Sequence, residues 1–529
     1  MQRRLSELLT SDLVRRAAVV EGAGALKNGL DPIVTGLAYD SRKVEQGFLY
    51  FALPGLHVDG HSFIDAAVSR GAVAVLHQAP VAQKQPGVVY LRVTDSRFAM
   101  SPFADAFWRS PSRDLAVIGV TGTEGKSTTV YLIYQLLELA GKKAGFVSTV
   151  QYRTGDTEEW NPEHQTTPEA PTVHTALAAM RDYGMEYAVI ESSSHGLSPR
   201  TNRLGDVAFD VGVMTNVTHE HLEFHGTWEQ YREDKANLFR TLDLHDHVKT
   251  IRGVKKPKPS FGVVNADDPS AAYFAAATKK PTLTFSAKGD DADLSLRNVK
   301  SEAFGNTYDV YVRTTGETIS VGDKLPGAFN AGNVLAALLV VSGLLNASVA
   351  SLQPLIPKLR PVRGRMSVVE KGQSFEVVVD YAHTPSSFEA VFPPIRKRIS
   401  ERGGRVISLF GSGGERDRDK RPRQGRIAAD YSDIVILSDE DPRGEVPMEL
   451  LEEIAAGCPE KKRGEELFLI PDRPIAIRKA FSLARKGDLV ILLGKGHENS
   501  IIYKNGTIPF DEIAEAEKAL AEMGYGDAK

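Results

Sequence analysis

A glycine-rich loop followed by a lysine and a serine carries the clearest chemical signal in this chain. It lies in VIGVTGTEGKSTT, residues Val117–Thr129. Glycines let backbone N–H groups close around a phosphate, Lys126 can reach terminal phosphates, and the hydroxyl of Ser127 suits Mg²⁺. Val120 stands where the first glycine of the common P-loop would be. The sequence therefore predicts a phosphate-binding loop of a variant P-loop class.

A carboxylate in the same part of the chain could hold a cation beside the phosphates. Glu191 ends the apolar run YAVIE, so at the end of a parallel strand it would share an edge with the P-loop. The histidines of HEHLEFH (His219–His225) could suggest zinc, but no compact four-ligand set accompanies them. A hard Mg²⁺ ion fits Glu191 better. Lys235, in YREDKANLF, would repel Mg²⁺ as a free ammonium, so a direct role requires its conversion into an anion.

Four apolar runs in the last third of the chain each lead into a polar loop. The loops are YAHTP, GSGGERDRDKRP, SDEDPRGE and GKGHE. In an open parallel sheet, ligands bind outside the carboxyl ends of the strands, so we expect these loops to gather at one site. They carry Asp380, His383, Arg416, Asp441, Arg443, Lys495 and Glu498.

The elements that must position these groups alternate between strand-like and helical patterns. Leu115–Val120 is predicted to be a buried strand and Lys126–Ala140 a helix that Gly141 ends. The alternation indicates an α/β protein with a doubly wound, mostly parallel sheet around the P-loop. We expect an antiparallel extension over Leu283–Val321 and a helix over Asn330–Leu345. Breaks near residues 111 and 360 divide the chain into three segments.

Composition fits a large globular enzyme. The chain has 529 residues, of which 42% are hydrophobic and 25% charged, and its formal net charge of −4 indicates neither a nucleic-acid nor a membrane partner. Its only cysteine, Cys458, excludes a disulfide within the chain and suits a reducing cytosol. The N-terminus lacks the apolar stretch of a signal peptide, and the apolar run Val334–Gly343 is too short to span a bilayer. We expect a cytoplasmic monomer.

The motifs, taken in order, resemble those of the Mur ligases, specifically the MurE type. TGTEGKST resembles the family's TGTNGKTT, and ESSSHGL resembles EVSSHGL. Counterparts also exist for DSRKVEQGFLYFALPG, NVTHEHLEFHGTWEQYREDKANLF, LPGAFNAGN, GRM, DYAHTP, GGERDRDKRP, DEDPRGE and GKGHE. No single motif decides the matter, but their ordered set is highly specific and spans nearly the whole chain.

The resemblance implies three domains and one reaction. The domains are a small α/β uridine-nucleotide-binding domain (1–111), a central ATPase domain (112–358) and a Rossmann-like C-terminal domain that binds the amino acid (359–529). The implied enzyme is an ATP- and Mg²⁺-dependent ligase of peptidoglycan synthesis. It phosphorylates the D-Glu carboxylate of UDP-N-acetylmuramoyl-L-alanyl-D-glutamate, and an amino-acid amine then attacks the acyl phosphate.

The resemblance also implies roles for particular residues. The ATP-binding positions are Gly122, Thr123, Gly125, Lys126, Ser127, Thr128, Asn330, Arg365 and Asp380. The positions for the UDP-muramoyl dipeptide are Ser41, Thr166, Thr167, Ser193 and Arg203. Those for the incoming amino acid are Arg416, Asp441, Arg443, Gly494 and Glu498. The metal ligands are Ser127, Glu191, His221 and Lys235, of which the last three join Lys126 as catalytic residues. Lys235 matches the lysine that the family carbamylates, which would supply the missing anion.

Two departures from the family pattern bear on function. Glu124 replaces a customary Asn in the P-loop. Members that add diaminopimelate usually read DNPR where this chain reads EDPR, residues Glu440–Arg443. An ionised Asp441 cannot donate a hydrogen bond and would repel a substrate carboxylate, whereas Arg443 still suits one. We therefore expect a basic diamino acid, L-lysine or ornithine, ahead of meso-diaminopimelate.

Two other hypotheses stay open at this stage. One is a related ligase, such as a folylpolyglutamate synthase or another Mur ligase, against which the DSR segment and the DPR loop argue. The other is a non-catalytic nucleotide-binding protein of the same fold. The presence of Lys126, Glu191, His221 and Lys235 argues against that class.

Overall fold

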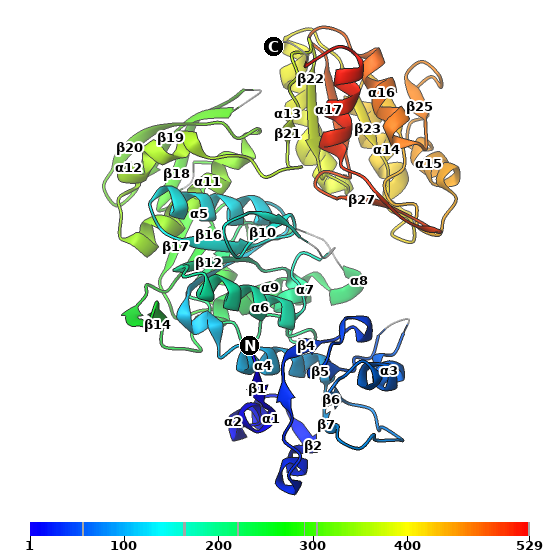
Figure 1. Cartoon of the computed structure of the whole chain (residues 1–529). Coiled ribbons are helices and arrows are strands. Elements are labelled where there is room, and N and C mark those ends of the chain that lie inside the picture. The colour runs from blue at the N-terminus through cyan, green and yellow to red at the C-terminus, as the bar shows by residue number, and fades with distance from the viewer. Residues whose placement is uncertain (56–57, 162–164, 219–221, 290, 303–304, 527–529) are drawn as a thin grey trace. The chain divides into compact units, whose positions relative to one another are not determined.

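A computed structural model describes residues 1–55, 58–161, 165–218, 222–289, 291–302 and 305–526. The chain divides into two compact units (Figure 1). The first comprises Met1–Val299, Thr307–Asp323 and Phe329–Leu359. The second comprises Lys300–Asn306, Lys324–Ala328 and Arg360–Lys529. Both are α/β structures, which confirms the predicted fold class.

The N-terminal part of the first unit is a five-stranded sheet in the order β2-β7-β6-β5-β4. Its strands are β2 (Val19–Glu21), β4 (Gly36–Ala38), β5 (Phe48–Phe51), β6 (Ala74–His77) and β7 (Val89–Val93). The strands β4 to β7 are parallel, and β2 pairs antiparallel with β7. One face packs against helices α1 (Leu5–Leu8), α2 (Ser11–Arg16) and α4 (Ser96–Phe107), and the other against α3 (Ile64–Ser69).

The P-loop belongs to an eleven-stranded sheet in the order β11-β10-β9-β12-β8-β13-β16-β17-β18-β19-β20. Six of its strands, from β9 to β17, are parallel neighbours. They are β9 (Ala144–Val147), β12 (Tyr187–Glu191), β8 (Ala116–Thr121), β13 (Val211–Met214), β16 (Phe261–Asn265) and β17 (Thr282–Ser286). The remaining strands are β10 (Gln151–Arg153), β11 (Glu159–Trp160), β18 (Leu294–Glu302), β19 (Gly305–Val312) and β20 (Glu317–Asp323), of which β11 and β20 form the two edges. The doubly wound, mostly parallel sheet is confirmed.

Helices cover both faces of this sheet (Figure 1). On one side α5 (Lys126–Leu139) packs against α11 (Phe329–Leu345), and on the other lie α6 (Ala170–Asp182) and α9 (Trp228–Thr241).

The antiparallel extension expected over Leu283–Val321 is wrong at its start, because β17 pairs parallel with both β16 and β18. Strand propensity could not reveal this direction, because direction depends on where the chain returns to the sheet.

The second unit holds a six-stranded sheet in the order β21-β22-β26-β23-β24-β25. Its strands are β21 (Ser367–Val368), β22 (Glu376–Asp380), β23 (Val406–Phe410), β24 (Ile434–Leu437), β25 (Leu467–Leu469) and β26 (Leu489–Leu493). All are parallel except β21. Helices α13 (Pro385–Glu401), α14 (Lys420–Tyr431) and α15 (Pro447–Ala455) cover one face, and α16 (Arg473–Leu483) and α17 (Glu512–Glu522) the other. The four polar loops therefore leave the same edge of one sheet, as predicted.

Short elements complete the described chain. Three strand pairs join β1 (Arg3–Arg4) to β3 (Ile33–Val34), β14 (Val248–Ile251) to β15 (Val254–Pro257), and β27 (Ser500–Tyr503) to β28 (Gly506–Pro509). The short helices are α7 (Ser194–Leu197), α8 (Leu222–His225), α10 (Ala271–Ala275) and α12 (Val349–Leu352). Among the described helices, none is by itself long and apolar enough to cross a bilayer. One pair of consecutive helical segments, α11 and Val349–Lys358, reaches that length and apolar composition together, but the two are bent by 110°.

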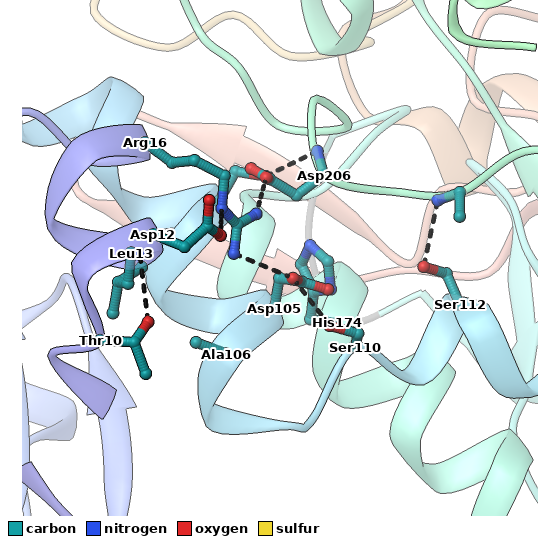
Figure 2. A network of polar contacts seen from close by, with 12 residues as sticks. Thr10, Asp12, Leu13, Arg16, Asp105, Ala106, Ser110, Ser112, His174 and Asp206 are labelled. Atoms are coloured by element: carbon teal, nitrogen blue, oxygen red, sulfur yellow. Dashed lines mark hydrogen bonds and ion pairs between the residues drawn. The ribbon is translucent and has the colours of Figure 1, made fainter. Parts of the chain in front are cut away.

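A network of charged side chains joins the two sheets of the first unit (Figure 2). Arg16 on α2 pairs with Asp206, with Asp12 at 2.9 Å and with Asp105 of α4 at 3.5 Å. His174 of α6 lies fully buried beside it, with Nδ1 4.0 Å from Oδ1 of Asp105. Since α4 also packs against α6, the N-terminal sheet is attached to the P-loop sheet by both packing and charge.

Candidate active site

The P-loop follows β8, and glycine is required where it turns. A Cβ added at Gly122 would lie 1.9 Å from Oγ1 of Thr215, on the loop after β13. Gly125, directly before α5, has φ +80°, and a Cβ there would lie 2.7 Å from Oδ1 of Asn333. The loop therefore runs too close to its neighbours for any side chain at these two positions.

Oxygen atoms converge where α5 begins. The hydroxyl of Ser127 donates to the carboxylate of Glu191, at 3.0 Å from Oε1 and 2.9 Å from Oε2. The N–H of Thr149 donates to the same carboxylate at 2.7 Å. Glu191 reaches this place because β12 runs parallel to β8, with Glu191 paired to Val120. A buried carboxylate beside a hydroxyl is a donor set that suits a hard cation such as Mg²⁺.

Two lysines flank this oxygen cluster. Lys126 Nζ donates to the backbone oxygen of Thr123 at 2.7 Å. Lys235, on α9, is 1% exposed, and its Nζ donates to the backbone oxygen of Gly122 at 2.5 Å and lies 4.4 Å from the centre of the Tyr231 ring. The structure thus places Lys235 at the P-loop itself. The predicted metal ligand His221 lies outside the described residues.

A hydrogen-bonded chain that the sequence analysis missed connects α7, α8 and α9. His225 Nδ1 lies 2.8 Å from Oδ2 of Asp234, and its Nε2 lies 3.0 Å from Oγ of Ser194. All three residues are buried. Asp234 precedes Lys235, and Ser194 follows Ser193, so the chain ties two predicted site residues together. The histidine pattern HEHLEFH signalled this segment, but it did not reveal the partners of His225.

Four of the positions predicted for the muramoyl dipeptide cluster beyond the end of β12. Thr167 is fully buried; its hydroxyl donates to the backbone oxygen of Glu191 at 2.8 Å and accepts from the N–H of Ser193 at 2.9 Å. Arg203 donates to the backbone oxygen of Thr167 at 2.7 Å and to Glu169 at 3.0 Å. Thr166 is half-buried next to them. These residues therefore adjoin the oxygen cluster.

Ser41 lies elsewhere in the first unit, at the start of a 3₁₀ turn after β4. Beside it is a cavity of about 280 Å³ between this edge of the five-stranded sheet and α6. The lining includes Asp40, Lys43 and Phe48 on one side and Pro171 and Thr175 on the other.

Asn330 is brought to the P-loop by α11. Its Oδ1 accepts from Nδ2 of Asn333 at 3.0 Å, and Oδ1 of Asn333 accepts from the hydroxyl of Thr129 on α5 at 3.3 Å. Thr123 also belongs to the loop interior, since its Oγ1 lies 3.1 Å from the Tyr231 hydroxyl. Thr128 is half-buried in the first turn of α5.

In the second unit, Asp380 is the last residue of β22, and both of its carboxylate oxygens accept hydrogen bonds from backbone N–H groups. Its oxygens accept from the N–H groups of Met366 at 2.7 Å and Ala382 at 2.8 Å. Burial raises the pKa of Asp380 above its usual range, although Arg365 opposes the shift. Arg365 itself lies 4.6 Å from the centre of the Tyr381 ring. The predicted pair Asp380 and Arg365 is thus close together at the carboxyl edge.

The loops after β24 and β26 meet through a buried lysine. Lys495 Nζ lies 2.9 Å from Oδ1 of Asp441 and 2.5 Å from Oε2 of Glu498. These two carboxylates raise the pKa of Lys495 against the opposing effect of its burial. Asp441 Oδ1 also accepts the N–H of Ile502 at 2.9 Å. These charges were predicted to lie together, but the pairing in which Lys495 offsets the charge of Asp441 is not visible in the sequence.

The other predicted amino-acid positions surround this lysine. Gly494 has φ +97°, and a Cβ there would lie 2.5 Å from Oε2 of Glu440. Arg443 adopts the left-handed conformation at φ +54°, held by its N–H donating to the backbone oxygen of Ile502 at 2.9 Å. Such strain in a non-glycine residue is typical of functional sites. Arg416 is exposed on the loop after β23.

A second layer of buried charge lies beneath these loops. Arg473 and Glu512 are fully buried and paired at 2.8 Å, and Arg473 also donates to the backbone oxygens of Asp439 and Leu493 at 3.0 and 2.7 Å. Burial raises the pKa of Asp439 to about 6. Arg473 therefore holds the ends of two site loops, a role that its place in a helical pattern did not indicate.

Comparison with known proteins decides the family. The model of the Mur ligase middle domain matches residues 120–341, that of the Mur ligase glutamate ligase domain residues 364–496, and that of the Mur ligase family catalytic domain residues 33–108. A UDP-N-acetylmuramyl-tripeptide synthetase of Treponema denticola is 52% identical over 507 residues, covering 92% of this chain and 94% of the relative. This chain belongs to the Mur ligase family.

Other relatives of this Mur ligase carry two kinds of name. A UDP-N-acetylmuramyl-tripeptide synthetase of Treponema pallidum is 51% identical over 92% of this chain and 93% of its own. A UDP-N-acetylmuramoyl-L-alanyl-D-glutamate–2,6-diaminopimelate ligase of Geobacillus kaustophilus is 37% identical over 94% of this chain and 97% of its own.

Solved structures support the three-domain α/β fold. A 2,6-diaminopimelate ligase structure is 28% identical, with a TM-score of 0.59 over 93% of this chain and 96% of that one. A MurF ligase of Thermotoga maritima in complex with ADP shares the fold at 21% identity, with a TM-score of 0.61 over 92% and 98% of the two chains.

Proposed function

We propose that this Mur ligase uses ATP to join a diamino acid to the D-Glu carboxylate of UDP-N-acetylmuramoyl-L-alanyl-D-glutamate in peptidoglycan synthesis. The observation that carries the proposal is the convergence of Ser127, Glu191 and Lys235 on one phosphate-binding loop. The names of relatives about 50% identical over most of the chain support the same substrates.

In this proposal the P-loop holds ATP. Backbone N–H groups from Gly125 to Thr128 would face the phosphates, whereas those of Thr123 and Glu124 donate to Asn216. Lys126 would leave the backbone oxygen of Thr123 to approach the transferring phosphoryl group. A positive charge placed there stabilises the negative charge that develops in phosphoryl transfer. Asn330, Arg365 and Asp380 are the further ATP positions.

The residues near Glu191 fit Mg²⁺. Ser127 and Glu191 would hold it with His221, and the ion would offset phosphate charge. Lys235 does not fit as an ammonium, so we propose that it is carbamylated. The carbamate nitrogen would keep one N–H for the backbone oxygen of Gly122, and the added carboxylate would extend beyond it.

We assign the muramoyl dipeptide to the positions around Thr167 and the uridine end to the neighbourhood of Ser41. Thr166, Thr167, Ser193 and Arg203 would position the D-Glu carboxylate for phosphorylation, because Thr167 is bonded directly to the end of β12. The cavity beside Ser41 supports binding at that edge. Domain limits of 1–111, 112–358 and 359–529, a cytoplasmic location and a monomeric state belong to the same proposal.

For the incoming amino acid we propose L-lysine or ornithine ahead of meso-diaminopimelate. The ionised side chain of Asp441 can only accept hydrogen bonds, so it does not offer a ligand the amide donor that Asn supplies in a DNPR loop. Its partner Lys495 is engaged with both Asp441 and Glu498. Arg416 and Arg443 are available for the α-carboxylate, and Glu498 for an ammonium, beside the backbone of Gly494.

A ligation assay tests the whole proposal. Purified enzyme is given ATP, Mg²⁺, UDP-N-acetylmuramoyl-L-alanyl-D-glutamate and, separately, L-lysine, ornithine or meso-diaminopimelate, and kcat/KM is measured from phosphate release and product mass. We expect product with a basic diamino acid at the highest kcat/KM. A parallel assay with a folate and glutamate should show no reaction. Ligation of folate, or no substrate-dependent ATP hydrolysis, would contradict the proposed function.

A further inference from the structure

Two histidines and an aspartate meet at the end of the P-loop sheet opposite the active site. Asp210 directly precedes β13, and His245 and His247 lie on the segment that leads into β14. One Asp210 oxygen and one nitrogen from each histidine all lie within 4.8 Å of one another. Their side chains are 0%, 6% and 7% exposed, respectively.

The hydrogen bonds of His247 leave one nitrogen in need of a cation. Nε2 lies 2.8 Å from the backbone oxygen of Leu242, and Nδ1 lies 3.0 Å from Oδ1 of Asp210. A neutral imidazole carries one N–H, so when Nε2 donates to the carbonyl, the lone pair of Nδ1 faces a carboxylate. A proton or a metal ion must lie between them. A metal-bound histidine commonly donates its other N–H to a backbone carbonyl, which is the arrangement found here.

His245 supplies an independent indication. Its Nε2 is buried, finds no hydrogen-bond partner among the described residues and lies 3.9 Å from the same Oδ1 of Asp210. An unpaired buried nitrogen is costly unless a ligand satisfies it. Its ring centre lies 4.3 Å from that of His247, so the two nitrogens approach the carboxylate oxygen from neighbouring directions.

Asp210 is held so that Oδ1 alone remains for a ligand. Oδ2 accepts from the N–H of Val117 at 2.9 Å and from Lys249 Nζ at 2.9 Å. Lys249 is itself directed to the backbone oxygens of Ser112 and Ala208, at 3.0 and 2.7 Å. Its ammonium therefore acts on the oxygen away from the histidines, as a partner that orients a ligating carboxylate.

We propose that Asp210 Oδ1, His245 Nε2 and His247 Nδ1 form a binding site for Zn²⁺ or a similar transition-metal ion. Bonds of about 2.0–2.1 Å in tetrahedral geometry separate ligand atoms by roughly 3.3 Å. The distances of 3.0 and 3.9 Å from Oδ1 lie on either side of that value. Two imidazoles and one carboxylate suit zinc, and a water molecule would complete the site.

The metal would have a structural role rather than a catalytic one. Asp210 bonds to β8 through Val117, and its backbone oxygen accepts the N–H of Phe261 on β16. A metal ion would therefore fasten the segment after α9 to three central strands, at the edge away from Glu191.

Metal binding to the whole enzyme tests the proposal. Chelator-treated protein is titrated with Co²⁺ and, in competition with a chromophoric chelator, with Zn²⁺. We expect one tight site per chain with the visible absorption of tetrahedral Co²⁺. His245→Ala should weaken Zn²⁺ binding by more than about 100-fold, beyond the 10–100-fold effect of losing an outer-shell partner. His61→Ala, which removes a histidine from the 3₁₀ turn Gly60–Phe63, is the matched control and should bind normally.

Two outcomes would overturn the proposal. One is the absence of a tight Co²⁺ or Zn²⁺ site in the wild type. The other is a ¹⁵N NMR spectrum showing His247 protonated on both nitrogens in metal-supplemented protein. In that case the cluster would be an ion pair between His247 and Asp210, with no metal between them. His245→Asn serves as the second variant if His245→Ala does not fold. Ligase activity is not the readout, so failure here leaves the proposed function untouched.

Discussion

Lys126 and Ser127 are adjacent at the start of α5, yet they have different partners. Ser127 is bonded to the Glu191 carboxylate, whereas Lys126, within the described part of the chain, is bonded to the backbone oxygen of Thr123 alone. The lysine can therefore leave its partner for a phosphate at the cost of a single hydrogen bond.

Replacing this lysine should stop ligation without unfolding the enzyme. In Lys126→Ala the transferring phosphoryl group loses a positive charge, and we expect kcat to fall on the order of 10²–10³-fold. The measurement is phosphate release with both substrates present, with circular dichroism as the test of folding. Lys256→Ala, on the exposed strand β15, is the control. Wild-type turnover in a folded Lys126→Ala enzyme would refute the role.

The proposed carbamylation of Lys235 would have a distinct signature. Lys235→Ala should be nearly inactive because the P-loop loses an anion, and a short carboxylic acid such as acetate should restore part of the activity. Chloride at equal ionic strength should not, and acetate should not rescue Lys126→Ala, which lacks a cation instead. The absence of a carbamate signal in ¹³C NMR of an active wild-type enzyme kept in ¹³C-bicarbonate at neutral pH would contradict the modification.

The Asp441 hypothesis is tested by restoring the amide. Asp441→Asn supplies the customary donor and removes one partner of Lys495. We expect the ratio of kcat/KM for meso-diaminopimelate over lysine to rise by about tenfold, since a hydrogen bond to a charged group contributes roughly 1.5–3 kcal/mol. Asp417→Asn, exposed on the loop after β23, is the control. A wild type that already prefers meso-diaminopimelate, unchanged by the substitution, would show that Arg443 dominates.

The sequence was sufficient to place these residues but not their partners. Gly122, Lys126, Ser127 and Glu191 follow from a motif and a strand end, both of which are local patterns. The pairing of Lys495 with Asp441 joins positions far apart in the chain, so no local pattern reveals it. The same holds for Arg473 and Glu512, whose buried pair looks like two surface charges in the sequence.

At the scale of elements, His225 connects three helices at the site. It ends α8, which follows the undescribed His219–His221, and it bonds to Asp234 on α9 and Ser194 on α7. His225 is therefore a positioning residue for Lys235 and for the loop of Ser193.

Breaking this connection should affect catalysis more than substrate binding. In His225→Ala we expect kcat to fall about tenfold or more and the Mg²⁺ concentration for half-maximal rate to rise, because Lys235 loses its alignment. KM for the uridine substrate should change less, since Ser41 lies in another sheet. Partial recovery in His225→Gln would show that hydrogen bonding matters. A merely structural role would lower stability and leave the Mg²⁺ dependence unchanged.

Element limits were predicted well where one signal dominated. The helix after the P-loop begins at Lys126 as expected and ends at Leu139, with Gly141 at φ +76° just beyond. The helix from Asn330 to Leu345 begins one residue earlier, at Phe329. The failure at β17 concerned strand direction, which only the tertiary fold determines.

At the scale of the whole molecule, the attachment of the N-terminal sheet is sensitive to acid. Burial lowers the pKa of His174 to about 4, so the folded enzyme keeps this ring neutral while the unfolded chain protonates it near pH 6.5. The contribution of the neutral His174 ring to the free energy of unfolding is therefore fully present above pH 6.5 and is lost as the pH falls toward 4. Asp105, whose burial raises its pKa, acts in the opposite sense.

Removing this histidine should flatten the pH dependence of stability. Between pH 6.5 and 5 we expect the wild type to lose about 2 kcal/mol through His174, and His174→Phe to lose correspondingly less. Denaturant unfolding at each pH, monitored in the first unit, measures the difference. Asp105→Asn keeps the histidine and removes the opposing contribution of Asp105, so its loss of stability over this pH range should be no smaller than that of the wild type. Equal slopes for wild type and His174→Phe would contradict the argument.

The strand order of the second unit has a consequence for how the enzyme is made. β26 lies in the middle of its sheet, between β22 and β23, but it is the last of the six strands to be synthesised. While the ribosome is still translating, β22 and β23 expose facing edges that have no partner, and unpaired edges invite association with other chains. A nascent chain that stalls before Leu489 would therefore carry every site loop except the last and still have no closed sheet to support them.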